Sequence, residues 1–307
     1  MRIAFVNTLY KSAQKNKDIM LITGDLGFSV FEDYIKNLPK QYLNAGVAEQ
    51  NMTGLAAGLA MEGKTPFIYS IVPFVTMRNF EQIRNDICYQ NLNVKIVGIG
   101  AGFSYGSYGH THHGLEDVGV LRTLANLTIF CPGDPKEVEF VTRQALKIKG
   151  PVYIRLGKAG EPVIHDAGSK LEMGKGAMIT DGKDLTIIAM STMLYRALEV
   201  SKILTRKGLS VRVVSMHTIK PFDSNIVISS AKKTRAIFSL EEHSIIGGLG
   251  SAVAEVLAEN SISTKFKRLG VPDKFTKVIG NQEFMREANN LSVDQIVDTI
   301  LRFIKND

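Results

Sequence analysis

The sequence predicts two α/β domains, each built on a parallel sheet, and two observations support this. Short runs of β-branched and other apolar residues alternate with helix-length segments along nearly the whole chain, a pattern typical of parallel sheets covered by helices on both faces. The alternation is interrupted once, by the glycine-rich stretch 157–184, whose apolar residues keep no helical period. We therefore expect one domain over residues 1–156, a linker over 157–184 and a second domain over 185–307.

In the first domain, the clearest helix start precedes residues 135–147. Asp134 is expected to be the N-cap, Pro135 occupies the first turn and Glu137 the third position. The remaining expected elements are strands at 19–23, 65–69, 94–98, 128–130 and 152–155, and helices at 50–61 and 77–89.

In the second domain, the best-marked element is the last helix. Ser292 and Gln295 form a capping-box pattern, and the helix is expected to run to about residue 304. The other expected elements are strands at 185–189, 211–215, 236–240 and 266–269, and helices at 194–206 and 251–258.

Length and composition exclude several classes of protein. A chain of 307 residues with 45% hydrophobic and 22% charged residues is not intrinsically disordered, because disorder requires low hydrophobicity and high net charge. Its longest apolar runs fall short of the ~20 residues that span a bilayer, and its first residues turn polar too soon for a signal peptide. We expect a cytoplasmic protein that binds no membrane.

Charge and cysteine content narrow the choice of ligands. The 37 basic and 30 acidic residues give a formal charge of +7, but the basic residues are scattered and the densest group, 265–268, is short. We therefore expect no nucleic-acid binding and instead an affinity for small anions such as sugar phosphates. Cys88 and Cys131 lack the spacing of metal ligands and are expected to be buried free thiols.

Two general motifs are present in weak form. Residues 102–106 match the hydrolase pattern G-x-S-x-G, but a glycine-rich loop follows where that motif needs a helix. Residues 247–250 resemble a phosphate loop, but they do not open directly from a strand and no G-K-[ST] follows. Close packing at a helix start is the favoured interpretation of the second.

Glu49 forms the first of three more informative clusters. It stands at the head of a helix without another charge through residue 61. A first-turn glutamate that complements the helix dipole is one interpretation. The other is that the helix is buried all round, so that Glu49 is desolvated and suited to sharing a proton. Gly54 and Gly58 would let another backbone approach closely, as at a subunit interface.

The other two clusters are a histidine-rich loop and an aromatic segment. His110, His112 and His113 lie in a glycine-rich stretch, with poor spacing for a metal site but suited to hydrogen bonding a polyhydroxylated or anionic ligand. Residues 69–82 place Phe74 and Phe80 around Arg78. These aromatics equally suit a core, and the arginine equally suits the surface.

In order and spacing, the three clusters resemble the pyrimidine-binding and C-terminal domains of transketolase-like, thiamine-diphosphate-dependent enzymes. The resemblance covers nearly the whole chain and rests on residues 24–29, 46–50, 109–113, 132–134, 220–223 and 241–243. It implies a pyrimidine-binding-type fold followed by a transketolase C-terminal α/β domain. The family's diphosphate-binding motif, G-D-G…N, has no match, so the chain resembles the C-terminal half of a split transketolase.

For the cofactor, the resemblance implies that Glu49 hydrogen-bonds the aminopyrimidine ring of thiamine diphosphate and controls its tautomer. Phe74 is expected to stack on that ring, with Val75 or Phe80 as alternatives. Further cofactor contacts are expected from Asp25, Arg78 and Phe80. The divalent ion, Mg²⁺ or Ca²⁺, is expected to be held mainly by a partner subunit.

For the substrate, the resemblance implies that His112 is catalytic and faces the reacting atoms, with His110 also binding substrate. Ser29 and Arg155 match positions that bind the substrate phosphate, for which a guanidinium fork is suited. The chain departs from the family at Tyr108, where an acidic residue is usual, and at His110, which replaces a proline. Donor or acceptor is therefore expected to differ from the standard pentose phosphates.

The resemblance thus implies transfer of a two-carbon ketol unit between sugar phosphates or related sugars. Activity is expected only with an N-terminal transketolase subunit, in a heterotetramer in which this chain also self-associates. Two enzyme alternatives remain open: a deoxyxylulose-phosphate-synthase-like enzyme and a 2-oxoacid dehydrogenase beta subunit. A non-catalytic scaffold is a third, but a buried carboxylate such as Glu49 would cost a scaffold stability without benefit.

Overall fold

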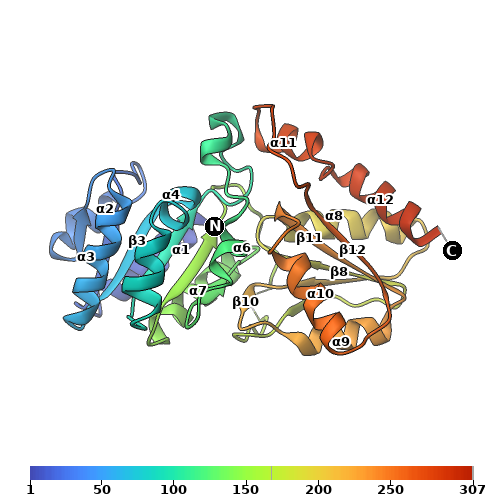
Figure 1. Ribbon diagram of the computed structural model, residues 1–307, viewed down its shortest axis with the longest axis horizontal. Helices are drawn as coiled ribbons and strands as arrows, with labels where there is room; N and C mark the ends of the chain where they lie inside the picture. The colour runs from blue at the N-terminus through green and yellow to red at the C-terminus, as the bar shows by residue number, and fades with distance from the viewer. Residues whose placement is uncertain (167, 306–307) are drawn as a thin grey trace.

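The computed structural model describes residues 1–166 and 168–305 and consists of two α/β lobes (Figure 1). The first lobe contains a seven-stranded sheet of order β10-β5-β6-β4-β3-β1-β2, and the second a five-stranded sheet of order β12-β11-β8-β9-β7. The strands within each sheet are parallel except for one strand at an edge, β10 in the first sheet and β7 in the second. The predicted fold class is therefore confirmed.

The first domain keeps the expected alternation of strands and helices. Its elements are α1 (Arg2–Ala13), β1 (Ile19–Thr23), α2 (Glu32–Asn37), η1 (Pro39–Gln41), β2 (Tyr42–Asn44), α3 (Glu49–Met61), β3 (Thr65–Ile71), α4 (Val72–Thr76), α5 (Phe80–Gln82), the π-helical η2 (Ile83–Cys88), β4 (Lys95–Ile99), η3 (Gly106–Tyr108), η4 (His110–His112), α6 (Asp117–Leu121), β5 (Thr128–Phe130), α7 (Pro135–Lys147) and β6 (Val152–Leu156).

The second domain is a smaller repetition of the same architecture. Its elements are β7 (Ala177–Thr180), β8 (Leu185–Ala189), α8 (Met193–Arg206), β9 (Val211–Ser215), β10 (Thr218–Lys220), α9 (Ser224–Lys233), β11 (Ala236–Ser244), α10 (Leu249–Glu259), β12 (Lys265–Val271), α11 (Gln282–Ala288) and α12 (Val293–Lys305). One of these strands, β10, leaves its own domain and pairs with β5.

The hydrophobic core is continuous between the domains. Helices α1 and α7 cover one face of the first sheet, where Phe5 and Val138 are buried. The core on the opposite face begins under α3 with Met52 and extends through Ile129 to Val253 of α10. Burial of apolar surface therefore holds the two lobes together as well as stabilising each.

The second sheet begins inside the predicted linker, and one predicted helix begins later than expected. Strand β7 lies inside the predicted linker 157–184 and pairs with β9. The helix predicted at 77–89 is present over residues 80–88, where the α-helical α5 continues directly into the π-helical η2, after the separate turn α4. Asn79 stands at the N-cap of α5 with φ of −117°, and its buried side chain donates a hydrogen bond to Thr53 of α3.

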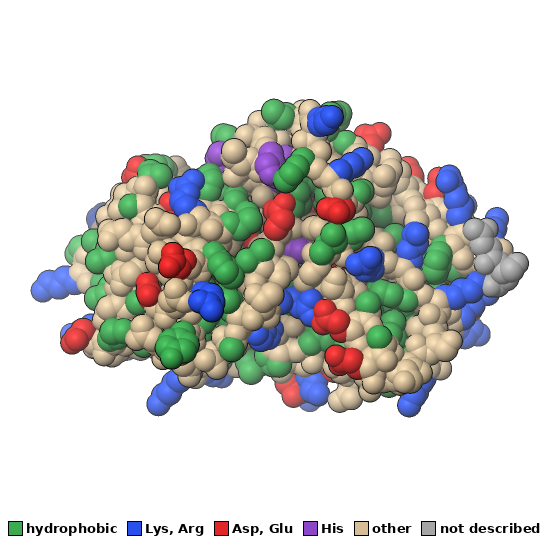
Figure 2. Space-filling view, viewed as in Figure 1, with side chains coloured by type: hydrophobic (Ala, Val, Ile, Leu, Met, Phe, Trp, Pro, Cys, Tyr) green, Lys and Arg blue, Asp and Glu red, His purple; other side chains and the backbone are tan. Residues whose placement is uncertain are grey.

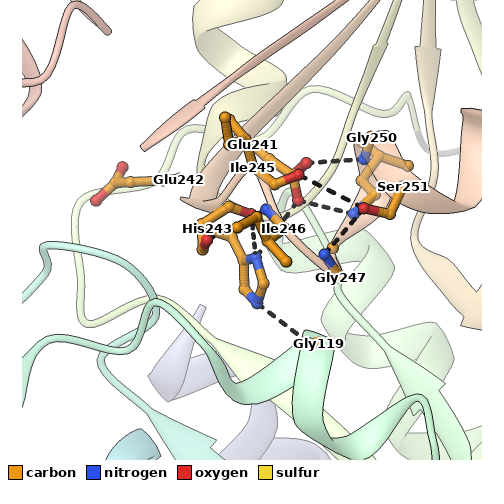
Figure 3. Close-up of polar contacts among 12 residues, drawn as sticks. Gly119, Glu241, Glu242, His243, Ile245, Ile246, Gly247, Gly250 and Ser251 are labelled. Carbon is orange, nitrogen blue, oxygen red and sulfur yellow. Dashed lines mark hydrogen bonds and ion pairs between the residues drawn. The ribbon is translucent and has the colours of Figure 1, made fainter. Parts of the chain in front are cut away.

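The last residues of β11 attach the second domain to the first through both faces of the strand. On one face, the Glu241 carboxylate accepts the N–H groups of Leu249 and Gly250, each at 2.7 Å, and so caps α10. On the same face, His243 Nε2 accepts the N–H of Gly119 in α6 at 3.2 Å. Figure 3 shows both contacts, with Glu242 extending the other way.

His243 is held as a neutral imidazole by this geometry. Its Nδ1 donates to the carbonyl of Ser244 at 2.7 Å, so Nε2 must remain the acceptor for Gly119. Protonation would place an N–H against an N–H, and burial of the ring lowers the pKa of His243 to about 4. The contact between β11 and α6 therefore depends on an uncharged His243.

This dependence predicts that His243 destabilises the fold in acid. Between its ordinary pKa of 6.5 and about 4, the unfolded chain binds a proton at this ring that the folded chain does not, so stability falls as pH falls. His243→Asn, which can still accept from Gly119, should remove up to about 3 kcal/mol of that pH-dependent loss. Urea unfolding at pH 7 and pH 4.5 measures it, with the exposed His110→Asn as control. An equal pH dependence in wild type and His243→Asn would contradict the assignment.

Candidate functional site

The centre of the candidate site is the carboxylate of Glu49, the first residue of α3. Its side chain is 1% exposed, and both oxygens have partners: Ser70 Oγ donates to Oε1 at 3.0 Å and Arg78 Nη1 donates to Oε2 at 2.7 Å. A Cβ on Gly24 would lie 3.3 Å from Oε1, so the backbone at the end of β1 also lies against this carboxylate. The predicted desolvation of Glu49 is confirmed.

Helix α3 itself is not buried all round, which corrects the expectation. Leu55 is 39% and Met61 57% exposed, and a Cβ on Gly54 or Gly58 would meet nothing within 4 Å. The helix lacks charge because it has a small, apolar outer face as well as a buried one. Glu49 is buried by the ends of β1 and β3 at its own end of the helix.

Arg78 connects the Glu49 carboxylate to Phe74, and Phe74 in turn contacts His112. The Arg78 guanidinium carbon is 4.1 Å from the centre of the Phe74 ring, within cation–π range. On its other side, the Phe74 ring meets the ring of His112 edge-on, with centroids 5.1 Å apart. Three of the predicted site residues are therefore brought together around Glu49.

A continuous row of rings leads from His112 to an exposed ammonium group. The ring of His112 is 5.2 Å from that of Tyr108, which is 5.8 Å from that of Tyr105. Lys158 Nζ lies 5.0 Å from the Tyr105 ring. We call this set the site row: Glu49, Arg78, Phe74, His112, Tyr108, Tyr105 and Lys158. It joins a buried carboxylate at one end to a cation at the other.

Three residues of the site row, Tyr105, Tyr108 and His112, belong to one loop, which we call the histidine loop (residues 102–114). Gly102 and Gly114 exchange two backbone hydrogen bonds of 2.9 Å and close its base. In Figure 2, histidine side chains are exposed at the upper edge of the molecule, where Figure 1 places the segment between β4 and α6. The same view shows basic side chains spread over both lobes, without a single basic patch.

His112 is suited to hydrogen bonding as a neutral ring. Partial burial and the nearby Arg78 both lower the pKa of His112. Its Nδ1 shares a hydrogen bond of 2.9 Å with the hydroxyl of Thr111. A neutral imidazole has one donor and one acceptor nitrogen, so the ring can contact a hydroxyl or a carbonyl near neutral pH.

Asp25 and Ser29 lie on the exposed loop that follows β1. The Asp25 carboxylate accepts a hydrogen bond of 3.0 Å from Asn44, one residue beyond the Gly24 backbone that contacts Glu49. Ser29 has a left-handed φ of 59° and donates its N–H to Glu32. Both side chains are exposed, so their contacts with cofactor and substrate remain predictions.

His110 and Phe80 lie away from the site row. The His110 ring packs edge-on against Phe275, with centroids 4.7 Å apart, and lines a cavity of about 310 Å³ with Glu116 and residues 271–276. Phe80 packs against the core beneath α3, as does the fully buried Val75. Phe74 is therefore the aromatic residue that accompanies Glu49.

Arg155 is the predicted site residue that the structure places elsewhere. It is fully buried: Nε donates to Asp117 at 2.9 Å, and Nη2 donates to the carbonyls of Gly114 at 2.7 Å and Glu242 at 3.1 Å. The structure gives no support to the expected contact of Arg155 with a substrate phosphate, because the side chain is fully buried and its Nε and Nη2 donate to protein groups. Lys158, three residues further along, is the exposed cation at this edge of the sheet.

Sequence reasoning missed Ser70, Tyr105 and Lys158. Ser70 could have been found, because a short polar side chain in a strand that is otherwise buried and mostly apolar requires a hydrogen-bond partner. Lys158 follows β6 at the carboxyl edge of a parallel sheet, where ligands of such sheets bind, and was overlooked in favour of the nearby arginine. Tyr105 carries no signal of its own, since its role depends on its place between Lys158 and Tyr108.

Comparison with known proteins identifies related chains. The family model described as "Transketolase, pyrimidine binding domain" matches residues 1–160, and "Transketolase, C-terminal domain" matches residues 174–296. A subunit of the apulose-4-phosphate transketolase of Phocaeicola vulgatus is 37% identical over 99% of this chain and 97% of that protein. The 6-deoxy-6-sulfo-D-fructose transketolase subunit SqwH of Clostridium sp. strain MSTE9 is 37% identical over 97% of this chain and 92% of that protein.

A solved structure is similar over the same extent. It is titled "Split gene transketolase, inactive beta4 tetramer", is 38% identical to this chain and superimposes with a TM-score of 0.88. The similarity covers 98% of this chain and 97% of the other. Both domains of the present structure are therefore matched together.

The buried position of Arg155 predicts a structural role. Arg155→Gln should destabilise the fold by about 3–5 kcal/mol, because it leaves the Asp117 carboxylate buried without its charge partner. Urea unfolding measures the loss, and Arg143→Gln on the exposed face of α7 is the control, expected to change stability by less than ~1 kcal/mol. A wild-type free energy of unfolding for Arg155→Gln would contradict this role.

Proposed function

This chain belongs to the transketolase family, and on that premise we propose that it is the C-terminal subunit of a two-polypeptide, thiamine-diphosphate-dependent transketolase. Such an enzyme transfers a two-carbon ketol unit between sugar phosphates or related sugars. The observation that carries the proposal is the buried carboxylate of Glu49 beside Phe74 and His112. Both relatives described above match over nearly their whole length and are named as transketolase subunits, which favours ketol transfer over the alternatives considered.

The residues around Glu49 fit the aminopyrimidine half of the cofactor. A carboxylate oxygen accepts a hydrogen bond from a ring nitrogen, the Phe74 ring offers an aromatic face, and the bare backbone of Gly24 leaves room beside Oε1. We assign the charged half of the cofactor to the partner subunit. Residues 1–166 and 168–305 contain no group of three His, Cys, Asp or Glu side chains arranged to hold a metal ion.

Three residues of the site row have a definite task in this proposal. When bound, thiamine diphosphate supplies a ring that stabilises a carbanion. Glu49 orients the pyrimidine and holds a proton at its carboxylate, Phe74 fixes the plane of that ring, and His112 binds oxygen atoms of the ketose next to the reacting carbon. Burial of Glu49 excludes water from the proton that it shares.

The partner in this proposal is an N-terminal transketolase subunit that holds the diphosphate and its Mg²⁺ or Ca²⁺. We propose a heterotetramer in the cytoplasm, in which copies of this chain associate through the outer face of α3. Its open Gly54 and Gly58 and its exposed Met61 support that choice. In the residues that the structure describes, no helix is long and apolar enough to cross a membrane.

Lys158 is proposed to bind the anionic end of the substrate in place of Arg155. It is exposed at the carboxyl end of β6 and lies at the far end of the site row from Glu49. The names of the two relatives include a sugar phosphate and a sulfonated sugar, both of which carry an anionic group. Ser29, also exposed, is proposed as a second contact, whereas His110 is proposed to define the edge of the site with Phe275.

The role of Glu49 predicts a large loss of activity without loss of the fold. Glu49→Gln keeps the shape of the side chain but cannot share the proton, so turnover of the two-subunit enzyme should fall by about 10²–10⁴-fold, the range for a positioned proton-transfer group. Glu62→Gln, at the other end of α3, is the matched control. If Glu49→Gln lowered the melting temperature but not the turnover, the role of Glu49 would be limited to stabilising the start of α3.

The division of the cofactor between two chains predicts that this chain alone is inactive. Calorimetric titration with thiamine diphosphate and Mg²⁺ should show weak binding to the lone chain and tight binding once the partner is present, because the proposal assigns the ligands of the diphosphate to the partner. The related solved structure is titled inactive as a beta4 tetramer, in line with this expectation. Turnover by the lone chain would overturn the proposal.

The assignment of Lys158 predicts a selective effect on KM. Lys158→Ala should raise KM for a phosphorylated ketose by about 10–100-fold, which corresponds to the ~1.5–3 kcal/mol of a charged hydrogen bond, and leave hydroxypyruvate, which lacks phosphate, nearly unaffected. His112→Ala should instead lower kcat with both donors. Lys170→Ala, another exposed lysine after β6, serves as control. Equal effects of Lys158→Ala on both donors would refute the phosphate contact.

A further inference from the structure

Glu242 is a buried acid that the proposed chemistry does not use. It lies on the face of β11 opposite Glu241 and His243 (Figure 3), in the second domain. Its carboxylate nevertheless reaches the first domain, where Oε1 accepts the N–H of Phe103 at 2.5 Å. Phe103 is the second residue of the histidine loop.

The carboxylate is surrounded by donors from three other segments. Arg286 of α11 donates through Nε at 2.7 Å and lies within 2.6 Å through Nη2. Gln282 of the same helix donates to Oε1 at 2.9 Å, and Thr192 at the start of α8 donates to Oε2 at 3.3 Å. The Glu242 carboxylate therefore accepts hydrogen bonds from α11, from the start of α8 and from the histidine loop at the same time.

The base of the histidine loop is shaped to receive this carboxylate. Gly102 has a left-handed φ of 63°, and a Cβ there would lie only 2.5 Å from Glu242 Oε1. Gln282 also contacts the Ser104 hydroxyl at 3.4 Å. Because no side chain fits at Gly102, the loop backbone packs directly on the acid.

Both stems of the loop are embedded in the second domain. Phe103 and Leu115 belong to the apolar core that lies beneath α8 and α12, and the Leu115 carbonyl accepts the N–H of Ser244 at 2.8 Å. From Phe103, contact passes to the ring of His113 at 5.2 Å, the residue next to His112. The second domain thus fixes the loop that supplies His112 to the first.

We propose that Glu242 is a positioning residue for His112, acting through the Phe103 N–H and the histidine loop. The inference rests on the proposed function for the importance of His112. The hydrogen bond to Phe103 sets where the loop leaves the domain interface, and a displacement of about 1 Å in a reacting group can cost about 10²-fold in rate. Glu242 touches neither Phe74 nor Glu49 in this account.

Two double variants separate positioning from simple stability. Glu242→Gln/Arg286→Gln removes the ion pair but keeps an oxygen to accept from Phe103. Glu242→Met/Arg286→Met removes the acceptor as well, and apolar replacement of a buried ion pair is commonly tolerated by the fold. The control is Glu283→Gln, which removes another carboxylate partner of Arg286 at an exposed position.

Hydrogen exchange and ring NMR on the lone chain test the loop without reference to activity. In the Met/Met variant, amides of residues 102–114 should exchange at least tenfold faster, and the pKa of His112 should rise toward 6.5 as its burial is lost. In the Gln/Gln variant and in Glu283→Gln, both should stay near wild type. If the Glu242→Met/Arg286→Met variant kept the wild-type exchange rates at residues 102–114 and the wild-type pKa of His112, the proposal would be overturned.

Kinetics of the two-subunit enzyme provide the second readout. Met/Met should lower kcat by about 10²-fold with KM nearly unchanged, and Gln/Gln should retain most of the activity. Gln282→Ala, at a half-buried position, should also lower kcat, by a smaller factor. If neither Met/Met nor Gln282→Ala changed kcat, the positioning role would be overturned. An inactive wild-type enzyme would instead reject the proposed function, while the exchange experiment would still decide the role of Glu242.

Discussion

The arrangement of the two domains depends on one buried cation, the guanidinium of Arg155. A charge removed from water costs several kcal/mol unless its surroundings compensate it, and the acceptors of Arg155 come from different segments: Asp117 of α6, the Gly114 carbonyl and the Glu242 carbonyl. Tyr153 also donates to the same Asp117 oxygen, at 2.6 Å. Moving β11 or the end of the histidine loop would take an acceptor away from this buried charge, so the charge opposes a change in their relative positions.

From this constraint follows a division of labour between the domains. The first domain supplies every side chain of the site row up to Tyr105, with Lys158 just after its last strand. The second domain contributes none of these groups but surrounds the stems of the loop that carries three of them. The position of a reactive group on a loop depends on the contacts that hold the ends of the loop. This dependence gives the second domain, although remote from Glu49, a reason to be part of the same chain.

The sequence predicted the sheets well because their strands are short apolar runs between turn signals. β1, β5, β8 and β9 begin and end at the predicted residues, as does α7, whose start is marked by its N-cap. Prediction failed where tertiary contacts overrule the local pattern. The helix predicted at 77–89 begins only at residue 80, after Asn79, whose side chain is bonded to Thr53, and β7 lies in a glycine-rich stretch that has no strand pattern.

The same distinction explains the outcome at the site. Glu49, Phe74, Arg78 and His112 were named from sequence and do lie together, because their roles follow from residue type and order. Arg155 was misjudged, since the sequence does not tell whether a guanidinium at a strand end faces a ligand or a buried carboxylate. Burial of the neighbouring Asp117, which decides this, is a property of the folded chain alone.

The geometry at Glu49 also indicates which of its partners a ligand would replace. Ser70 is fully buried, whereas the side chain of Arg78 is 42% exposed. An ion pair with one partner this exposed contributes little net stability, yet Glu49 left alone would be a buried charge without a partner, at a cost of several kcal/mol. A ligand with its own N–H donor for Oε2 would remove that cost if it replaced Arg78. The exposed Arg78 is therefore the partner of Glu49 that such a ligand could replace, whereas the buried Ser70 would keep its bond to Oε1.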